Sequence, residues 1–254
     1  MSGAGKRVIV VGGGMSGVAA AIAAKKQGAE TMIFERYGFF GGTSTASMVS
    51  PFMNFSAGNK QLVYGVFQEI LDELVKYGGR KPGSRAFDSE TLKFVLYDLM
   101  DKYNVEYLLH TYLTDIVKEG NIIKEIITES KSGKENFAAD FFVDTSADAD
   151  LAAKAGVKFE VGRESDGLTQ AMTLMFRIAN VDMKKVLEYS KKDPQNFSFI
   201  EEDINGVSIA GFKKEIEAER RITKYDNPLD YIFFVTTHRD DLVIVNTTRS
   251  LRVS

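Results

Sequence analysis

Cysteine is absent from this chain of 254 residues. Its absence excludes disulfide bonds, a cysteine nucleophile, zinc sites built on thiolates and iron–sulfur clusters ligated by cysteine. Only two histidines occur, His110 and His238, and they lie far apart in the sequence. A metal site rich in histidine is therefore not expected either, and we predict no metal centre.

Long apolar runs and an excess of positive charge are also lacking. No apolar run approaches the roughly 20 residues that a membrane-spanning helix needs, and no apolar signal segment precedes the first predicted strand. The 32 Lys and Arg residues are dispersed and are outnumbered by 35 Asp and Glu residues, which does not favour a nucleic acid as partner. These features predict a cytoplasmic protein that binds neither nucleic acid nor a membrane.

The first 35 residues predict one strand–helix–strand unit. A β-branched run at residues 6–11 stops at glycines, as a buried parallel strand does. Residues 15–28 are rich in alanine and end in two lysines followed by a glycine, which is typical of a helix C-terminus. A second apolar strand at residues 31–34 ends at Glu35.

The remainder of the chain predicts further helices and short strands. After a loop rich in Gly, Ser and Thr at residues 37–58, two amphipathic helices are expected at residues 61–77 and 90–102. Short strands separated by turns then predict a β-meander at 105–109, 113–118, 122–130 and 136–143. Beyond Gly156 we expect strands near 171–178, 231–236 and 242–248 and helices near 182–191 and 212–222.

The turn between the first strand and the first helix contains the pattern G-x-G-x-x-G, from Gly12 to Gly17. In such a turn Gly12 allows the tight bend, Gly14 lets the backbone approach a pyrophosphate, and Gly17 lets the helix pack close to the strand. The first helical residues, Met15 and Ser16, belong to a helix N-terminus that offers free N–H groups to phosphates. The pattern predicts a dinucleotide-binding turn.

Glu35 supports this interpretation because it closes the second strand 18 residues after Gly17. Its carboxylate would accept hydrogen bonds from a ribose diol and would repel a 2′-phosphate. The glycine pattern and Glu35 together do not separate FAD from NAD.

The residues that follow Glu35 bear on this choice. An acid at the end of the second strand, followed by Gly-Gly and hydroxyl residues, resembles the FAD-binding domain of the glutathione-reductase-like flavoproteins. Residues 109–113 lie where members of that family pass the backbone beside adenine, and residues 142–150 resemble the family's A-T-G-D segment. The resemblance implies noncovalently bound FAD and adds cofactor-binding residues to those of the turn: Arg36, Gly41, Gly42, Thr43, Leu113 and Ser146.

The resemblance implies an α/β fold. We expect a Rossmann-like FAD/NAD(P)-binding domain with a β-meander at residues 1–160, including a helical insertion at about 51–84, and a partial α+β substrate or cap domain at residues 161–254. Members of the family are usually longer and complete their FAD domain with a Gly-Asp pair near the C-terminus. No Gly-Asp dipeptide occurs in this sequence, so we expect a truncated, N-terminal member of the family.

The function expected from the resemblance is that of an FAD-dependent oxidoreductase, with hydride transfer between a small-molecule substrate and the flavin. The catalytic residues are not assigned. A complementary C-terminal half or a second copy of the chain is the expected protein partner. One alternative is a fragment that binds an adenine dinucleotide without turnover. A second is a nicotinamide-dependent dehydrogenase, which would leave the Gly-Gly loop and the meander without a purpose.

Two further groups of residues are candidates for substrate contacts. Guanidinium groups suit carboxylates, so any of three arginines could bind a substrate carboxylate: Arg177, Arg239 and Arg249. Three apolar residues that follow the Gly-Gly loop could line a cavity on the flavin side: Phe52, Met53 and Phe55. Ser44 does not fit a nucleophile elbow, because the final glycine of that motif and its preceding strand are missing.

Overall fold

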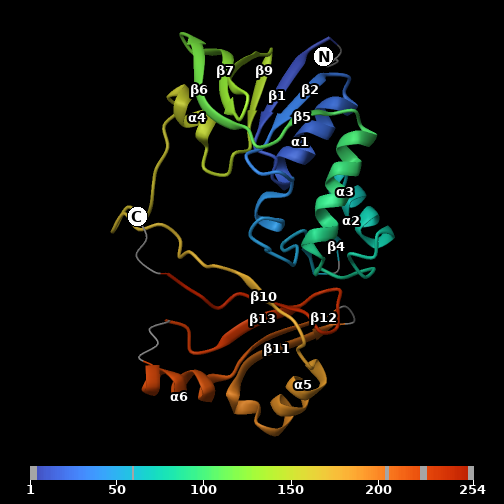
Figure 1. Ribbon diagram of the computed structural model, residues 1–254, viewed down its shortest axis with the longest axis vertical. Coiled ribbons are helices and arrows are strands. Elements are labelled where there is room, and N and C mark those ends of the chain that lie inside the picture. Colours follow the sequence, from blue (N-terminus) through green and yellow to red (C-terminus); the bar gives the residue numbers. More distant parts are fainter. Residues whose placement is uncertain (1–4, 59, 204–205, 224–227, 251–254) are drawn as a thin grey trace. The chain divides into compact units, whose positions relative to one another are not determined.

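The computed structural model describes residues 5–58, 60–203, 206–223 and 228–250. Residues 1–4 belong to the segment for which no signal sequence is predicted, and they lie outside this range, as do the last four residues. The chain divides into two compact units (Figure 1). The first unit is Met1–Ala46, Phe55–Tyr77 and Glu90–Phe159, and the second is Ser47–Asn54, Gly78–Ser89 and Glu160–Ser254. The chain therefore passes between the units several times, whereas the sequence analysis divided it once, between residues 160 and 161.

The first unit is built on a sheet of four parallel strands, in the order β5-β2-β1-β9 (Figure 1). Their bounds are Arg7–Val11 for β1, Glu30–Phe34 for β2, Glu106–Leu108 for β5 and Phe141–Asp144 for β9. The central strand β1 pairs in parallel with β2 on one side and with β9 on the other. This sheet confirms the predicted Rossmann-like α/β fold.

Helix α1 (Met15–Lys26) connects β1 to β2 and packs on both strands. Its buried face consists of small and branched residues, so the helix can approach the sheet closely: Gly17, Val18, Ala21 and Ile22. Two more helices belong largely to this unit, α2 (Val66–Lys76) and α3 (Ser89–Lys102). The helix expected from residue 61 begins only at Val66, because Gly65 before it has a positive φ of 68° that ends the preceding loop.

The first unit also contains a three-stranded antiparallel meander, which follows β5 in the sequence. The meander consists of β6 (Tyr112–Glu119), β7 (Ile122–Ser130) and β8 (Gly133–Ala138). The predicted four-stranded meander was wrong at both ends, since β5 and β9 pair within the parallel sheet. The expected strand at residues 136–143 is divided at Asp140, whose carboxylate accepts the backbone N–H of Arg7 at 2.8 Å.

A short helix that the sequence analysis did not anticipate, α4 (Asp150–Ala155), follows β9. The carboxylate of Asp144 accepts the backbone N–H of Ser146 at 3.0 Å and that of Ala152 at 2.8 Å, and the Ser146 hydroxyl at 2.7 Å. Burial raises the pKa of Asp144, but these hydrogen bonds outweigh the burial and leave the pKa below its ordinary value. Asp144 thereby joins the end of the sheet to the start of α4.

The second unit contains a five-stranded antiparallel sheet in the order β10-β14-β13-β12-β11 (Figure 1). The bounds are Phe176–Ile178 for β10, Phe197–Asp203 for β11, Gly206–Gly211 for β12, Ile232–Thr236 for β13 and Val243–Val245 for β14. Strands β11 and β12 were not predicted from the sequence. Helices α5 (Met183–Lys192) and α6 (Lys213–Thr223) complete the unit. Residues of α5 pack on a core of Phe197, Val207, Ile209, Phe234, Val243 and Val245.

The helices and strands of the described chain that have not yet been named are short: η1 (Gly42–Ser44), β3 (Ser56–Ala57), β4 (Lys60–Gln61) and η2 (Pro194–Asn196). None of the helices in the described part of the chain combines the length and the apolar character required to cross a bilayer.

We predict that Asp144→Asn destabilises the chain by about 2 kcal/mol at pH 7, because a charged acceptor of three hydrogen bonds becomes neutral. The pKa of Asp144 is lowered on folding, so its contribution is complete above the unfolded pKa of about 3.9 and is lost as the pH falls through the lower folded value. Urea unfolding at pH 7 and pH 3 should therefore show a large difference between variant and parent at pH 7 and a smaller one at pH 3. Asp148→Asn is the matched control, because this neighbouring side chain is exposed. An equal loss in both variants would contradict the prediction.

Candidate functional site

The glycine-rich turn between β1 and α1 is fixed by close backbone contacts. Gly12 has a φ of +102°, and its N–H donates to the carbonyl of Phe34 at 2.8 Å. A Cβ at Gly12 would overlap the carbonyl of Thr145 and would lie 2.8 Å from the Cα of Ser146. Only glycine therefore satisfies both the conformation and the space at this position.

Gly17 closes the turn from the helix side. A Cβ at Gly17 would overlap the carbonyl oxygen of Gly12 and would lie 2.8 Å from the Thr145 hydroxyl oxygen. That hydroxyl lies 2.9 Å from the carbonyl of Val11 and 2.8 Å from that of Gly12, to which it can donate. Thr145 was not chosen from the sequence, and its role follows from the pairing of β9 beside β1.

Gly14 has a different environment. Its φ of −66° and ψ of 179° are open to any residue, and the nearest heavy atom to a Cβ placed there is the Cα of Gly42 at 4.0 Å. The space beside Gly14 is therefore open. Gly14 is also the N-cap of α1, which has neither a side-chain cap nor an acidic residue in its first turn. No side chain of the first turn therefore neutralises the positive end of the helix dipole, which favours an anion at this point.

The Gly41–Gly42 loop lies beside the same space. The N–H of Gly41 donates to the carbonyl of Gly13 at 2.8 Å, and Gly14 and Gly41 form an isolated parallel bridge. A Cβ at Gly42 would lie 3.1 Å from the Cα of Gly14. The structure thus brings together the two glycine motifs that the sequence analysis grouped as one site.

Glu35 lies at the end of β2 and is only 5% exposed. One carboxylate oxygen accepts the N–H of Gly13 at 2.7 Å and the other accepts the N–H of Tyr37 at 2.8 Å. Each oxygen keeps a second lone pair. Glu35 therefore supports the glycine turn and still has acceptors for hydroxyl groups, a double role that its position in the sequence does not reveal.

The other candidate cofactor residues lie in more varied surroundings. Arg36 is exposed and its guanidinium carbon lies 5.0 Å from the centroid of the Tyr37 ring. Met15 and Leu113 are half-buried, whereas Ser16 and Thr43 are exposed. The hydroxyl of Ser146 donates to Asp144 and accepts the N–H of Asp150 at 2.8 Å, so it already serves the start of α4. A cofactor contact by any of these residues stays a prediction.

The arrangement suits the adenosine and diphosphate parts of a dinucleotide. The open space at Gly14 and the uncapped start of α1 suit a diphosphate, and the buried carboxylate of Glu35 suits a ribose diol. Within the described residues, no three His, Cys, Asp or Glu side chains are grouped so that they could hold a metal ion. A dinucleotide held by such an arrangement would supply the redox chemistry itself.

Comparisons with known proteins give a family and a fold. A family model described as FAD dependent oxidoreductase matches residues 7–253. The comparison with curated proteins gives no match.

Three solved structures illustrate the similarity in fold. L-proline dehydrogenase from P. horikoshii has a TM-score of 0.58 at 14% identity, over 96% of this chain and 70% of that chain. A geranylgeranyl bacteriochlorophyll reductase-like protein from Thermoplasma acidophilum has a TM-score of 0.55 at 16% identity, over 96% and 56%. The p-nitrophenol 4-monooxygenase from Pseudomonas putida has a TM-score of 0.52 at 15% identity, over 95% of this chain and 57% of that chain. The chain thus spans little more than half the length of two of these proteins.

Two glycine variants test the geometry of the turn. Gly14→Ala should leave the free energy of unfolding within about 0.5 kcal/mol of the parent, because its Cβ meets nothing closer than 4.0 Å. It should weaken FAD binding at least tenfold, about 1.4 kcal/mol, because the methyl group enters the space of the diphosphate. Gly17→Ala is the contrasting variant and should destabilise the fold by about 3 kcal/mol, since its Cβ overlaps a carbonyl oxygen.

Urea unfolding and titration with FAD give both quantities. Unchanged FAD affinity in folded Gly14→Ala would show that the diphosphate lies elsewhere. A stable Gly17→Ala protein would contradict the close approach at Gly12.

Proposed function

We propose a function for this chain, which belongs to the FAD dependent oxidoreductase family and has FAD as its cofactor. We propose that it is a flavin-dependent oxidoreductase in which hydride passes between a small-molecule substrate and noncovalently bound FAD. The fold of the first unit and the family match support this proposal. The observation that carries it is the open space at Gly14, bounded by an uncapped helix N-terminus and by the Gly41–Gly42 loop.

We assign the parts of the cofactor to named groups of the first unit. The diphosphate would lie at Gly14 and the first N–H groups of α1, and the adenosine ribose at Glu35. The Gly41–Thr43 loop would run beside the diphosphate toward the flavin. When bound, the flavin supplies the redox chemistry, and the protein supplies position and electrostatics.

A second candidate function is binding of an adenine dinucleotide without turnover by this chain alone, with the remaining parts of an enzyme supplied by a complementary chain. It is favoured by the coverage of 56% of the T. acidophilum protein, which leaves much of that relative without a counterpart here. The two functions differ in one measurement. The first expects reduction of the bound flavin by a substrate, whereas the second expects binding alone.

The absorbance spectrum of the purified chain tests cofactor binding. Bands near ~370 and ~450 nm that accompany the protein through gel filtration are expected, as for free flavins. Chromatography of the released cofactor should give FAD and not FMN. A colourless protein that takes up no added FAD would contradict cofactor binding by this chain.

Substitution of Glu35 tests the assignment of the ribose. Glu35→Gln should weaken binding of FAD and of ADP by ten- to a hundredfold, because a charged acceptor contributes about 1.5–3 kcal/mol. FMN lacks the adenosine ribose, so its affinity should change less than about twofold. Calorimetric titration of the three ligands measures these changes.

The control for this experiment is Glu30→Gln, at the other, exposed end of β2. It should change none of the three affinities. Because Glu35 also accepts two backbone N–H groups, thermal unfolding of each variant is recorded in parallel. An equal loss for FAD, ADP and FMN would show that the substitution acts through the turn and not through a ribose contact.

A further inference from the structure

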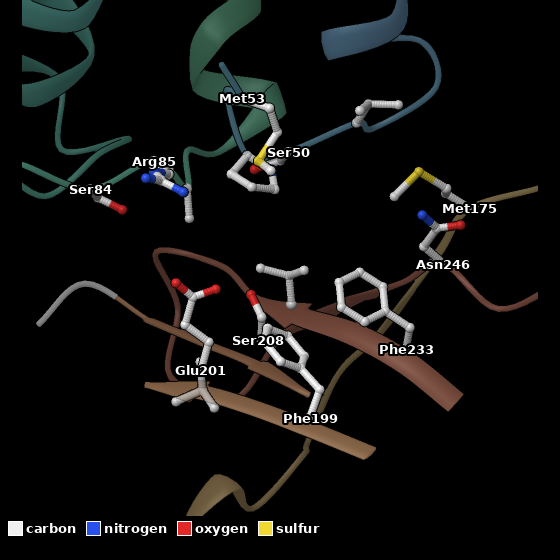
Figure 2. A pocket seen from close by; sticks show the side chains of 15 residues that line it. Ser50, Met53, Ser84, Arg85, Met175, Phe199, Glu201, Ser208, Phe233 and Asn246 are labelled. Carbon is white, nitrogen blue, oxygen red and sulfur yellow. The ribbon is translucent and has the colours of Figure 1, made fainter. Parts of the chain in front are cut away.

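The second unit contains a cavity of about 300 Å³, at the lower end of the roughly 300–1,000 Å³ range of small-molecule sites. All 15 of its lining residues belong to this unit (Figure 2). One wall comes from residues 49–53 and 84–86, and the opposite wall comes from strands β11, β12 and β13. The cavity is therefore formed within one compact unit.

Most of the cavity wall is apolar. Phe199 and Phe233 project from the sheet into the cavity, and Met53 and Met175 lie across the cavity from them (Figure 2). Phe199 is 42% exposed and Met53 is 60% exposed, so large apolar surfaces face the solvent in the cavity. Contact with an apolar ligand would remove this surface from water, and aromatic and thioether groups adapt well to planar or branched hydrocarbon.

One end of the cavity carries two opposite charges. Arg85 and Glu201 extend from opposite walls at this end, whereas Met175 and Asn246 lie at the other (Figure 2). The backbone of Arg85 is held in place, since its carbonyl accepts the N–H of Phe52 at 3.0 Å. Within the described residues, the side chains of Arg85 and Glu201 make no hydrogen bond or ion pair.

The arginines singled out from the sequence are engaged elsewhere. Arg239 forms an ion pair with Asp241 at 3.0 Å, and Arg177 donates to the hydroxyl of Ser89 at 2.8 Å. Arg249 does not line the cavity. Arg85 is thus the guanidinium group that this cavity offers to a ligand, and no sequence motif marks it.

We propose that this cavity binds the substrate, and that the substrate is a small zwitterion with an apolar body, of the class of apolar α-amino acids. Its carboxylate would bind the guanidinium fork of Arg85, its ammonium group would bind Glu201, and its side chain would contact the apolar wall. This inference rests on the proposed function, because it names the substrate class. The wall at residues 49–53 begins seven residues after Gly42 in the sequence.

The pair of charges is what selects a zwitterion. Because Arg85 and Glu201 lie at the same end of the cavity, a ligand with only a carboxylate that binds Arg85 would also bring its negative charge near Glu201. In the same way, a ligand with only an ammonium group that binds Glu201 would bring its positive charge near Arg85. Each would meet one attractive and one repulsive group, which reduces affinity relative to a ligand that complements both.

Calorimetric titration of the full chain with three probes that share a phenyl ring tests the proposal. Phenylalanine is the zwitterion, 3-phenylpropanoate carries only the carboxylate, and 2-phenylethylamine carries only the ammonium group. Phenylalanine should bind with a Kd at least tenfold lower than that of either other probe. Leucine serves as a second zwitterion of different shape and should also bind.

Two variants separate the contributions of the charges. Arg85→Gln should raise the Kd of phenylalanine at least tenfold without weakening 2-phenylethylamine, and Glu201→Gln should raise it without weakening 3-phenylpropanoate. The matched controls are Arg221→Gln and Glu217→Gln, which break an exposed ion pair on α6 outside the cavity and should leave every Kd unchanged. All four positions are exposed, so folding should be preserved.

Failure to bind phenylalanine and leucine in the millimolar range overturns the proposal. Equal affinity for the three phenyl probes, or equal effects of the cavity and control variants, overturns it as well. The flavin spectrum recorded on the same preparations keeps the two proposals apart. FAD binding without probe binding contradicts only the cavity assignment, and probe binding without FAD contradicts only the proposed flavin chemistry.

Discussion

The first unit depends on the close approach of α1 to the end of β1. A side chain at Gly17 would overlap the carbonyl oxygen of Gly12, so the helix can start where it does only because residue 17 is glycine. Residue 12 must be glycine for another reason, since its Cβ would overlap the carbonyl of Thr145. The hydroxyl of Thr145 lies within hydrogen-bond distance of the carbonyls of Val11 and Gly12, which ties β9 to the same point. The uncapped start of α1, the open space at Gly14 and the Gly41–Gly42 loop lie at the same turn.

The sequence predicted the elements whose signals are local. The signals are the β-branched run, the glycine turn and the lysines before Gly28, and each lies within a few residues of the element boundary that it marks. The structure has β1, α1 and β2 at the predicted positions. The assignment of strands to sheets was less successful, because pairing is decided by contacts distant in sequence. The run at 136–143 is apolar and continuous enough for one strand, yet Asp140 bonds to Arg7 and divides it. Strand β11 ends in acidic residues, which weakens the apolar pattern of a strand.

In the candidate sites too, the residues marked by local spacing were predicted, and the roles that depend on contacts distant in sequence were not. Gly12, Gly14, Gly17 and Glu35 were found because their spacing reflects one local unit, and the structure brings them together. The support that Glu35 gives to Gly13 and Tyr37 was not foreseen, since the glycine pattern assigns the carboxylate only to a ribose. Arg85 was missed for a different reason. It lies in a loop with no periodic pattern, and only the packing of this loop opposite strands β11, β12 and β13 within the second unit places it at a cavity.

The two sites differ in how they tolerate change. In the glycine turn, backbone atoms occupy the positions that side chains would take, so substitution at Gly12 or Gly17 changes the fold itself. The cavity of the second unit is lined by side chains, and Arg85, Phe199 and Glu201 are exposed enough to be replaced without disturbing a core. The buried core of that unit instead includes Ile209 and Phe234. The side chains that line the cavity can therefore change while the backbone contacts that form the glycine turn stay the same.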